Sequence, residues 1–111
     1  MPMVSLFFKM FYIFIYTSMS NCYIITYDIK NKDINSDTYQ TLYNAIMSFP
    51  NWAHINESTR AVRWENLSAV FIRDQLMKFI PFGSSLFVIK SWYESAWNNV
   101  LCDNQWLINN L

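Results

Sequence analysis

Six consecutive residues near the start of the chain, Tyr23-Ile-Ile-Thr-Tyr-Asp28, restrict its fold more than any other stretch. β-Branched and aromatic side chains dominate this run, which is typical of a strand buried on both faces in the middle of a sheet. The run ends on a carboxylate, and a buried carboxylate without a partner is costly. We therefore expect a central strand whose last residue, Asp28, lies at the rim of the sheet, where water, a metal or a partner can reach it.

A helix and an extended segment are predicted after this strand. Asp37 and Gln40 have the spacing of a capping box, which predicts the start of a helix, and Pro50 ends it. The apolar side chains of this helix form a stripe at Tyr39, Leu42, Tyr43, Ile46 and Phe49. Residues 52–64 are extended in character and form either one long bent strand or a tight hairpin that turns near residues 56–58.

The second half of the chain repeats the helix and strand patterns. A helix is predicted over residues 68–80, with Pro81 and Gly83 ending it. Its apolar stripe consists of Ala69, Ile72, Leu76, Phe79 and Ile80. Residues 86–89 have the composition of a short buried strand, and residues 92–101 are irregular. Asp103 can then cap a last helical turn or two that carries Trp106, Leu107 and Leu111.

This order of elements predicts the fold class. Strand, helix, extended pair, helix, strand is the βαββαβ pattern of a ferredoxin-like α+β sandwich, a sheet with two helices on one face. Only the short C-terminal helix is left to cover the other face. The chain also has more large aromatic side chains than so small a core needs, namely Trp52, Trp64, Trp92 and Trp97. Since such residues are enriched at subunit interfaces, we expect a homodimer that packs sheet against sheet.

The first 18 residues differ from the rest. Residues 3–16 are apolar apart from Ser5 and Lys9, and no positively charged region precedes them. The run is shorter than the ~20 residues that cross a bilayer as a helix. Two interpretations stay open: an upstream extension from a misassigned start before Met19, or a membrane or secretory segment. Residues 19–111 are expected to form one ferredoxin-like domain, and membrane contact is expected only if residues 1–18 are translated.

Composition excludes several classes of function. Gly83 is the only glycine, so no glycine-rich loop can bind a phosphate as in P-loop or dinucleotide-binding proteins. His54 is the only histidine, which excludes a multi-histidine metal site within one chain. Eight basic and eight acidic residues give no net charge, unlike a dedicated nucleic-acid-binding protein. Cys22 and Cys102 form no metal-binding pair, and we expect two reduced thiols in a cytoplasmic protein.

Several short motifs together resemble a known family. They are Tyr23-Ile-Ile-Thr-Tyr-Asp-Ile29, Trp52-Ala-His54 followed by Ser58-Thr59, Ile72-Arg-Asp74, Leu86-Phe-Val88 and Trp106-Leu107. In this combination the chain resembles the small bacterial and phage proteins called the SinR family, which are not the helix-turn-helix repressor of that name. The resemblance covers residues 19–111. It implies a protein of a phage or mobile element that starts at Met19, immediately before the first strand.

More distantly, the layout is similar to ferredoxin-like endoribonucleases of the VapD type and to the small dimeric nuclease that accompanies the CRISPR integrase. In those families an aspartate at the end of the first strand meets its symmetry mate and holds a divalent metal, Mg or Mn, or positions water. Asp28 matches that position. Ser58-Thr59-Arg60 corresponds to the extended segment after their first helix, although Arg60 stands where an aromatic residue is usual.

The candidate site residues are therefore Asp28, His54, Ser58 and Arg60. Asp28 is predicted to hold the metal, while His54 or Arg60 would act as a base or stabilise charge on a phosphate. In the alternative interpretation, Asp28 pairs with Lys30 or Lys32 and His54 is structural. Two functions follow from these readings. One is a dimeric, metal-dependent endoribonuclease, and the other is a non-catalytic module that binds a host protein, nucleic acid or a nucleotide ligand.

Overall fold

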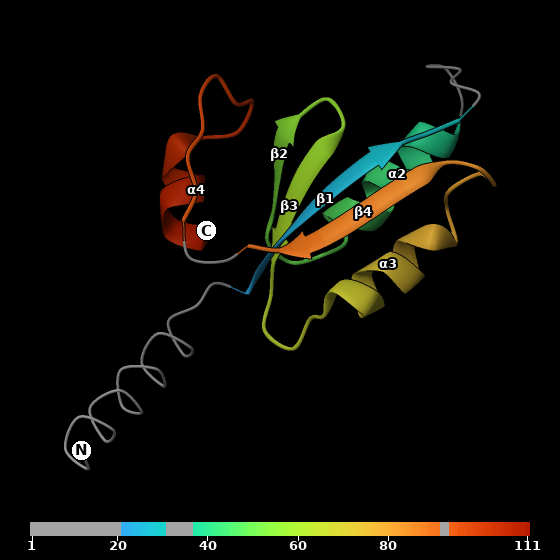
Figure 1. Cartoon of the computed structure of the whole chain (residues 1–111), viewed down its shortest axis with the longest axis horizontal. Coiled ribbons are helices and arrows are strands. Elements are labelled where there is room, and N and C mark those ends of the chain that lie inside the picture. The colour runs from blue at the N-terminus through green and yellow to red at the C-terminus, as the bar shows by residue number, and fades with distance from the viewer. Residues whose placement is uncertain (1–20, 31–36, 92–93) are drawn as a thin grey trace, which may run out of the picture.

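The computed structural model describes residues 21–30, 37–91 and 94–111, and within them the chain is an α+β protein with a four-stranded antiparallel sheet and three helices (Figure 1). The elements are β1 (Cys22–Asp28), α2 (Asp37–Met47), β2 (Trp52–Asn56), β3 (Thr59–Arg63), α3 (Ala69–Met77), β4 (Ser85–Lys90) and α4 (Asn104–Asn110). This confirms the predicted α+β class and resolves the extended segment into a hairpin. Its turn is formed by Glu57 and Ser58.

The strands lie in the order β2-β3-β1-β4, and each neighbouring pair is antiparallel. β1 is therefore a central strand, as its apolar sequence predicts. In the register of the sheet, Ile24 lies opposite Ala61 of β3 on one side and Ile89 of β4 on the other. Because side chains alternate along a strand and paired residues share a face, this register fixes which residues lie on each side of the sheet.

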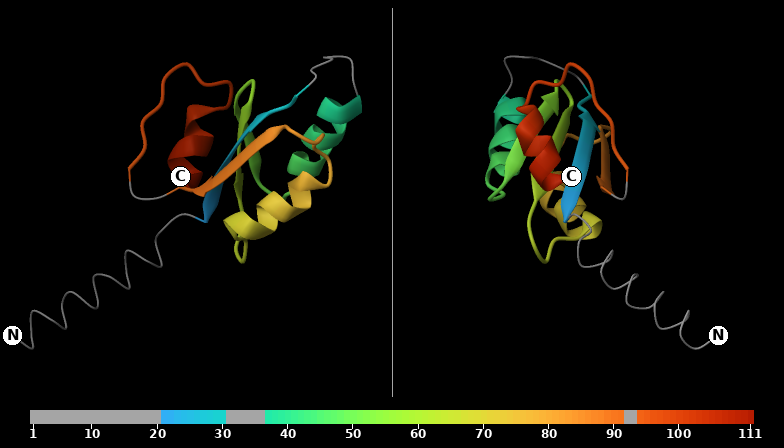
Figure 2. Two further views of the ribbon diagram at one scale, coloured as in Figure 1. Left: turned by 45° about the vertical axis from the view of Figure 1, so that its right-hand side comes forward. Right: turned by 90° about the vertical axis from the view of Figure 1, so that its left-hand side faces the viewer.

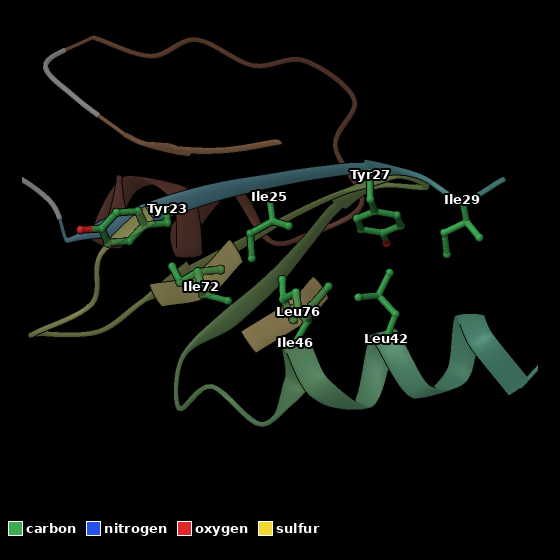
Figure 3. Close-up of a cluster of buried hydrophobic side chains, with 9 residues drawn as sticks. Tyr23, Ile25, Tyr27, Ile29, Leu42, Ile46, Ile72 and Leu76 are labelled. Carbon is green, nitrogen blue, oxygen red and sulfur yellow. The ribbon is translucent and has the colours of Figure 1, made fainter. Parts of the chain in front are cut away.

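One face of the sheet is covered by α2 and α3, and we call it the helix face. Tyr23, Ile25, Tyr27 and Ile29 point from β1 and the residue after it toward the two helices (Figure 3). They pack against Leu42 and Ile46 of α2 and against Ile72 and Leu76 of α3, all of which are fully buried. The apolar stripes predicted for the two helices thus include the four helix residues that are buried in this core. Ser68 caps α3, its hydroxyl oxygen accepting a hydrogen bond from the Phe71 amide at 3.0 Å.

The opposite face, which we call the outer face, is covered in part by α4 (Figure 2). Trp106 and Leu111 pack here against a small cluster of Cys22, Ala53 and Ala61. Three hydrogen bonds attach this C-terminal region to β2 and the residue before it. The Trp106 indole donates to Asn51 Oδ1 at 2.9 Å, and the Leu101 amide donates to the Ile55 carbonyl at 2.9 Å. Asn51 Nδ2 in turn donates to Asn110 Oδ1 at 2.7 Å. As predicted, Asp103 caps α4 by accepting from the Gln105 amide.

The structure differs from the sequence predictions at three places. β4 was expected to be buried, but it is an edge strand whose Phe87 and Ile89 are 58% and 50% exposed, because α4 lies over the other edge of the outer face. α3 ends at Met77, three residues before the predicted end, and Phe79 is partly exposed. Asp37 is the first residue of α2 and not the residue before it.

Other predictions fall on residues that the structure does not describe. These are the nature of residues 1–18, the position of Trp92 and the pairing of Asp28 with Lys32. Within residues 21–30, 37–91 and 94–111, no helix combines the length and hydrophobicity needed to cross a membrane.

Candidate functional site

Three of the four predicted site residues lie on the sheet, on two different faces, and the fourth, Ser58, lies in a turn. Asp28 is the last residue of β1 and is paired with Ser85 of β4. It alternates with Tyr27 and Ile29 of the buried core and therefore belongs to the outer face. Arg60 is paired with Ile25 and with His54, so both of these basic residues belong to the helix face. Within one chain, the structure brings His54 and Arg60 together and separates both of them from Asp28.

Arg60 is a charged residue that is nonetheless buried, with only 5% of its surface exposed. Its Nε donates a hydrogen bond to the Tyr27 hydroxyl at 3.3 Å, and its Cζ lies 4.3 Å from the centre of the Tyr43 ring. Tyr43 is thus positioned for a cation–π interaction with the guanidinium. These contacts join three elements, because Tyr27 lies in β1, Tyr43 in α2 and Arg60 in β3. They hold Arg60 under α2, where it can brace the core but has little access to a dissolved phosphate.

The tyrosines around Arg60 form a connected aromatic group. The ring centres of Tyr27 and Tyr43 are 6.3 Å apart, and those of Tyr39 and Tyr43 are 5.7 Å apart. Burial raises the pKa of Tyr27 above its ordinary value, and the opposing effect of the Arg60 charge is smaller. Tyr27 therefore stays protonated at neutral pH. Its hydroxyl also donates to the Glu57 carbonyl at 3.4 Å, which connects the core to the hairpin turn.

His54 lies beside Arg60 on the edge strand β2. Partial burial lowers its pKa below the ordinary value of 6.5, and the positive charge of Arg60 lowers it further. The imidazole is consequently neutral at pH 7. Its Nε2 is buried, and it has no hydrogen-bond partner within the part of the chain that the structure describes. A neutral ring with a buried nitrogen suits a structural role better than contact with a solvent-borne phosphate.

Ser58 lies in the turn between β2 and β3 and is exposed. Its carbonyl accepts a hydrogen bond from the Tyr27 amide at 3.1 Å, and its own amide donates to Asn56 Oδ1 at 3.2 Å. The backbone of Ser58 therefore fastens the hairpin turn to β1. These contacts explain the turn without requiring a chemical role for the hydroxyl.

Asp28 is exposed, as predicted for the rim of the sheet. The turn before β4 closes over the neighbouring residues. The Lys30 amide donates to Ser84 Oγ at 2.8 Å, and Gly83, which has φ +88°, lies against the Lys30 side chain. A Cβ atom at Gly83 would come within 2.9 Å of Lys30 Cδ. Asp28 is thus an accessible carboxylate at a well-packed end of the sheet.

The described residues of a single chain offer little to a metal ion. No group of three or more His, Cys, Asp or Glu side chains among them is arranged to hold one. Magnesium and manganese prefer carboxylate oxygens, of which Asp28 supplies a single group on the outer face. A divalent metal at this position would need ligands beyond those that the described residues bring together. Cys22 and Cys102 are not joined in a disulfide bond.

The outer face contains a feature that the sequence did not reveal. Ile24 and Thr26 of β1 lie beside Phe87 and Ile89 of β4, and we call these four residues the outer patch. Two of them, Ile24 and Ile89, line a groove of about 410 Å³ that separates the sheet from α4 and the segment that precedes α4. Strict alternation along β4 could have revealed that Phe87 and Ile89 share a face. It could not have revealed that α4 leaves that face open.

The surroundings of Arg60 on the helix face were also incompletely predicted. Tyr27 and Tyr43 hold Arg60, but their sequence context marks them as ordinary core residues. The available signal was Arg60 itself, a charged residue next to the apolar Ala61 and Val62 in the second half of the hairpin. Comparison of the chain with protein-family models, curated proteins and solved structures finds no match to any of the three. The function must therefore be inferred from the two faces of the sheet.

Proposed function

We propose that this protein is a ferredoxin-like interaction module that forms a homodimer through its outer patch. The single observation that carries the proposal is the exposure of Phe87 and Ile89 on a sheet face that α4 leaves half open. Contiguous apolar surface of this kind marks protein–protein contact sites in soluble proteins. A second copy, related by a two-fold axis, would cover the patch with an identical one.

The order of the strands supports the ferredoxin-like assignment. The order β2-β3-β1-β4, with every neighbouring pair antiparallel, is what two interleaved βαβ units produce. α2 follows β1, α3 follows β3, and both helices pack on the same core cluster. In such a sandwich the face opposite the helices is the one available for association.

A non-catalytic role fits the position of the basic residues. Arg60 is buried under α2, and His54 is neutral and directed to the same face. Neither is placed next to Asp28, so one chain does not assemble the predicted catalytic group. The balance of eight basic and eight acidic residues favours a protein partner over nucleic acid. We therefore infer that the dimer acts by binding another protein.

The dimer can be tested by measuring its mass. Full-length protein should be dimeric by light scattering or sedimentation, and Phe87→Asp should convert it to a folded monomer, because a charge would be placed in the contact. Phe82→Asp is the matched control, since Phe82 is a fully exposed phenylalanine in the turn before β4 and outside the patch. A monomeric wild type, or a dimer unaffected by Phe87→Asp, would reject the proposed interface.

A second function, metal-dependent RNA cleavage, is favoured by one specific observation. Asp28 is exposed and lies on the same outer face as the patch. A two-fold axis that crosses this face close to Asp28 would bring two Asp28 carboxylates toward each other. Such a pair fits the oxygen ligands that Mg or Mn prefers, and the bound metal would supply an activated water.

This second function has its own test. If the dimer cleaves single-stranded RNA with Mg or Mn, Asp28→Asn should reduce the rate at least ~100-fold while leaving the mass and the fold unchanged, because it removes an electrostatic contact of the transition state. Phe87→Asp should abolish cleavage as well, since the paired site requires the dimer. Wild-type protein that shows no metal-dependent cleavage, or an Asp28→Asn variant that retains it, would leave the interaction module as the function.

A further inference from the structure

A long apolar groove lies on the far side of the molecule from the outer patch. It runs between α2 and α3, encloses about 690 Å³, and we call it the helix groove. Its apolar wall consists of Phe49, Trp64, Leu67, Phe71, Leu76 and Phe79. Trp64 and Phe71 are 50% and 48% exposed. Aromatic surface of this extent is costly to leave in water, so the groove is expected to have an occupant.

The chain that precedes the described residues starts beside this groove. The Trp64 amide donates a hydrogen bond to the Asn21 carbonyl at 3.3 Å, and the Trp64 side chain is part of the groove wall. Tyr23 is fixed in the same region, because its hydroxyl donates to the Leu67 carbonyl at 2.8 Å. Residues 1–20 are therefore attached to the domain within a few residues of one end of the helix groove.

The sequence of residues 3–16 has the chemistry that this groove requires. Its least apolar side chains are Ser5, Lys9, Tyr12 and Tyr16, which are spaced by four, three and four residues. In a helix this spacing places all four on one face. The opposite face then carries Phe7, Phe11 and Phe14 together with Met3 and Met10. An amphipathic helix of this pattern is a common occupant of an apolar groove between two helices.

We propose that residues 3–16 bind as an amphipathic helix in the helix groove of their own chain, with Phe7, Phe11 and Phe14 directed inward. A helix of 14 residues is about 21 Å long. Residues 17–20 form the connection and span at most about 14 Å when extended, which is enough to turn the segment back from Asn21 to the groove. Lys9 would remain in water on the opposite face of the helix.

The tether favours the protein's own groove over other partners. A short linker holds the segment at an effective concentration in the millimolar range, well above that of a second copy in solution. A lipid bilayer is a less suitable environment, because the apolar run is shorter than a spanning helix and contains Lys9. The proposal concerns α2 and α3 and is independent of the interface at the outer patch.

Hydrogen exchange of the full chain, followed by mass spectrometry, tests this directly. Amides of residues 3–16 should be protected in the wild type. Phe71→Asp in the groove and Phe11→Asp in the segment should each raise their exchange by about tenfold or more, the ratio expected when burial of one phenylalanine is lost. Tyr12→Asp is the matched control, because it lies on the opposite face of the same helix, and its exchange should match the wild type. Phe11→Asp leaves the sequence of residues 21–111 unchanged, so it tests the contact even if Phe71→Asp perturbs α3.

If residues 3–16 bind elsewhere, or do not bind at all, hydrogen exchange gives a different result. Each of these results would overturn the proposal. Unprotected amides in the wild type, or equal protection in all four proteins, would show that the helix groove is not the binding site. Protection that increases with protein concentration would assign the segment to the groove of a second copy. Protection that requires phosphatidylcholine vesicles would assign it to a lipid surface.

Discussion

The two faces of the sheet differ in what they do for the molecule. On the helix face, α2 and α3 bury a continuous apolar core (Figure 3). A charged residue of the same face, Arg60, is buried as well. On the outer face lies the seven-residue α4 (Figure 2), whose Trp106 packs against the small cluster of Cys22, Ala53 and Ala61. Phe87 and Ile89 of β4, on the same face, remain half or more exposed. Most side chains of the buried core therefore lie on the helix face, and the half-exposed Phe87 and Ile89 lie on the other. His54 and Arg60 belong to the first face and Asp28 to the second.

The largest expected effect compares one residue from each face. Leu76→Ala should lower the free energy of unfolding by about 2–5 kcal/mol, because it leaves a cavity among fully buried side chains. Phe87→Ala should cost less than about 1 kcal/mol at low protein concentration, since more than half of that ring is already in water. Urea titrations of both variants give the comparison. Equal losses would mean that the two faces contribute alike and that β4 is better covered than the structure indicates.

The buried arginine tests whether the helix face uses its charge for stability. Arg60→Ala should lower the free energy of unfolding by about 2–3 kcal/mol, because it removes the cation–π contact with Tyr43 and leaves the Tyr27 hydroxyl without its donor. Arg73→Ala is the control. Arg73 pairs with Asp74 on the exposed surface of α3, where a substitution changes stability by no more than about 0.5 kcal/mol. If Arg60→Ala and Arg73→Ala were equally stable, the guanidinium of Arg60 would not be needed for stability and would be available for another role.

Much of the fold could be read from local sequence signals. The apolar run before Asp28 predicted a central strand, and Ser68 and Asp103 are at the starts of α3 and α4, where short polar residues cap helices. The hairpin was one of two alternatives, since strand patterns alone do not distinguish a bend from a turn. These successes concern short stretches, in which neighbouring residues determine the structure.

The candidate site was harder to predict because it depends on how elements dock. Alternation along β3 places Arg60 and Arg63 on opposite faces of the sheet, but the pattern does not say which face α2 covers. Once α2 lies over Arg60, that guanidinium becomes a core group and is removed from the surface. The same docking leaves Asp28 on the outer face. Separation of Asp28 from His54 and Arg60 is thus a consequence of tertiary packing, which residue spacing does not contain.

The smallest expected effect concerns His54 and its dependence on pH. Burial and the nearby Arg60 charge keep the folded-state pKa of His54 below the ordinary value of 6.5. Between these two pKa values the unfolded chain binds more protons than the folded one, so protonation favours unfolding. The contribution of His54 to stability is therefore complete above pH 6.5 and is lost as the pH falls through 6.5 toward the lower folded pKa. The effect should be modest, because the ring is only partly buried.

Urea titrations of wild type and His54→Gln from about pH 8 to about pH 5.5 would measure this contribution. Glutamine does not titrate, so the stability of the variant should change less over this range than that of the wild type. Carboxylates such as Glu57 are common to both proteins and cancel in the difference. A variant with the same pH dependence as the wild type would show that the ring of His54 is as well solvated in the folded chain as in the unfolded one. His54 would then be a solvent-accessible group of the helix face, and the burial of that face would end before the edge strand β2.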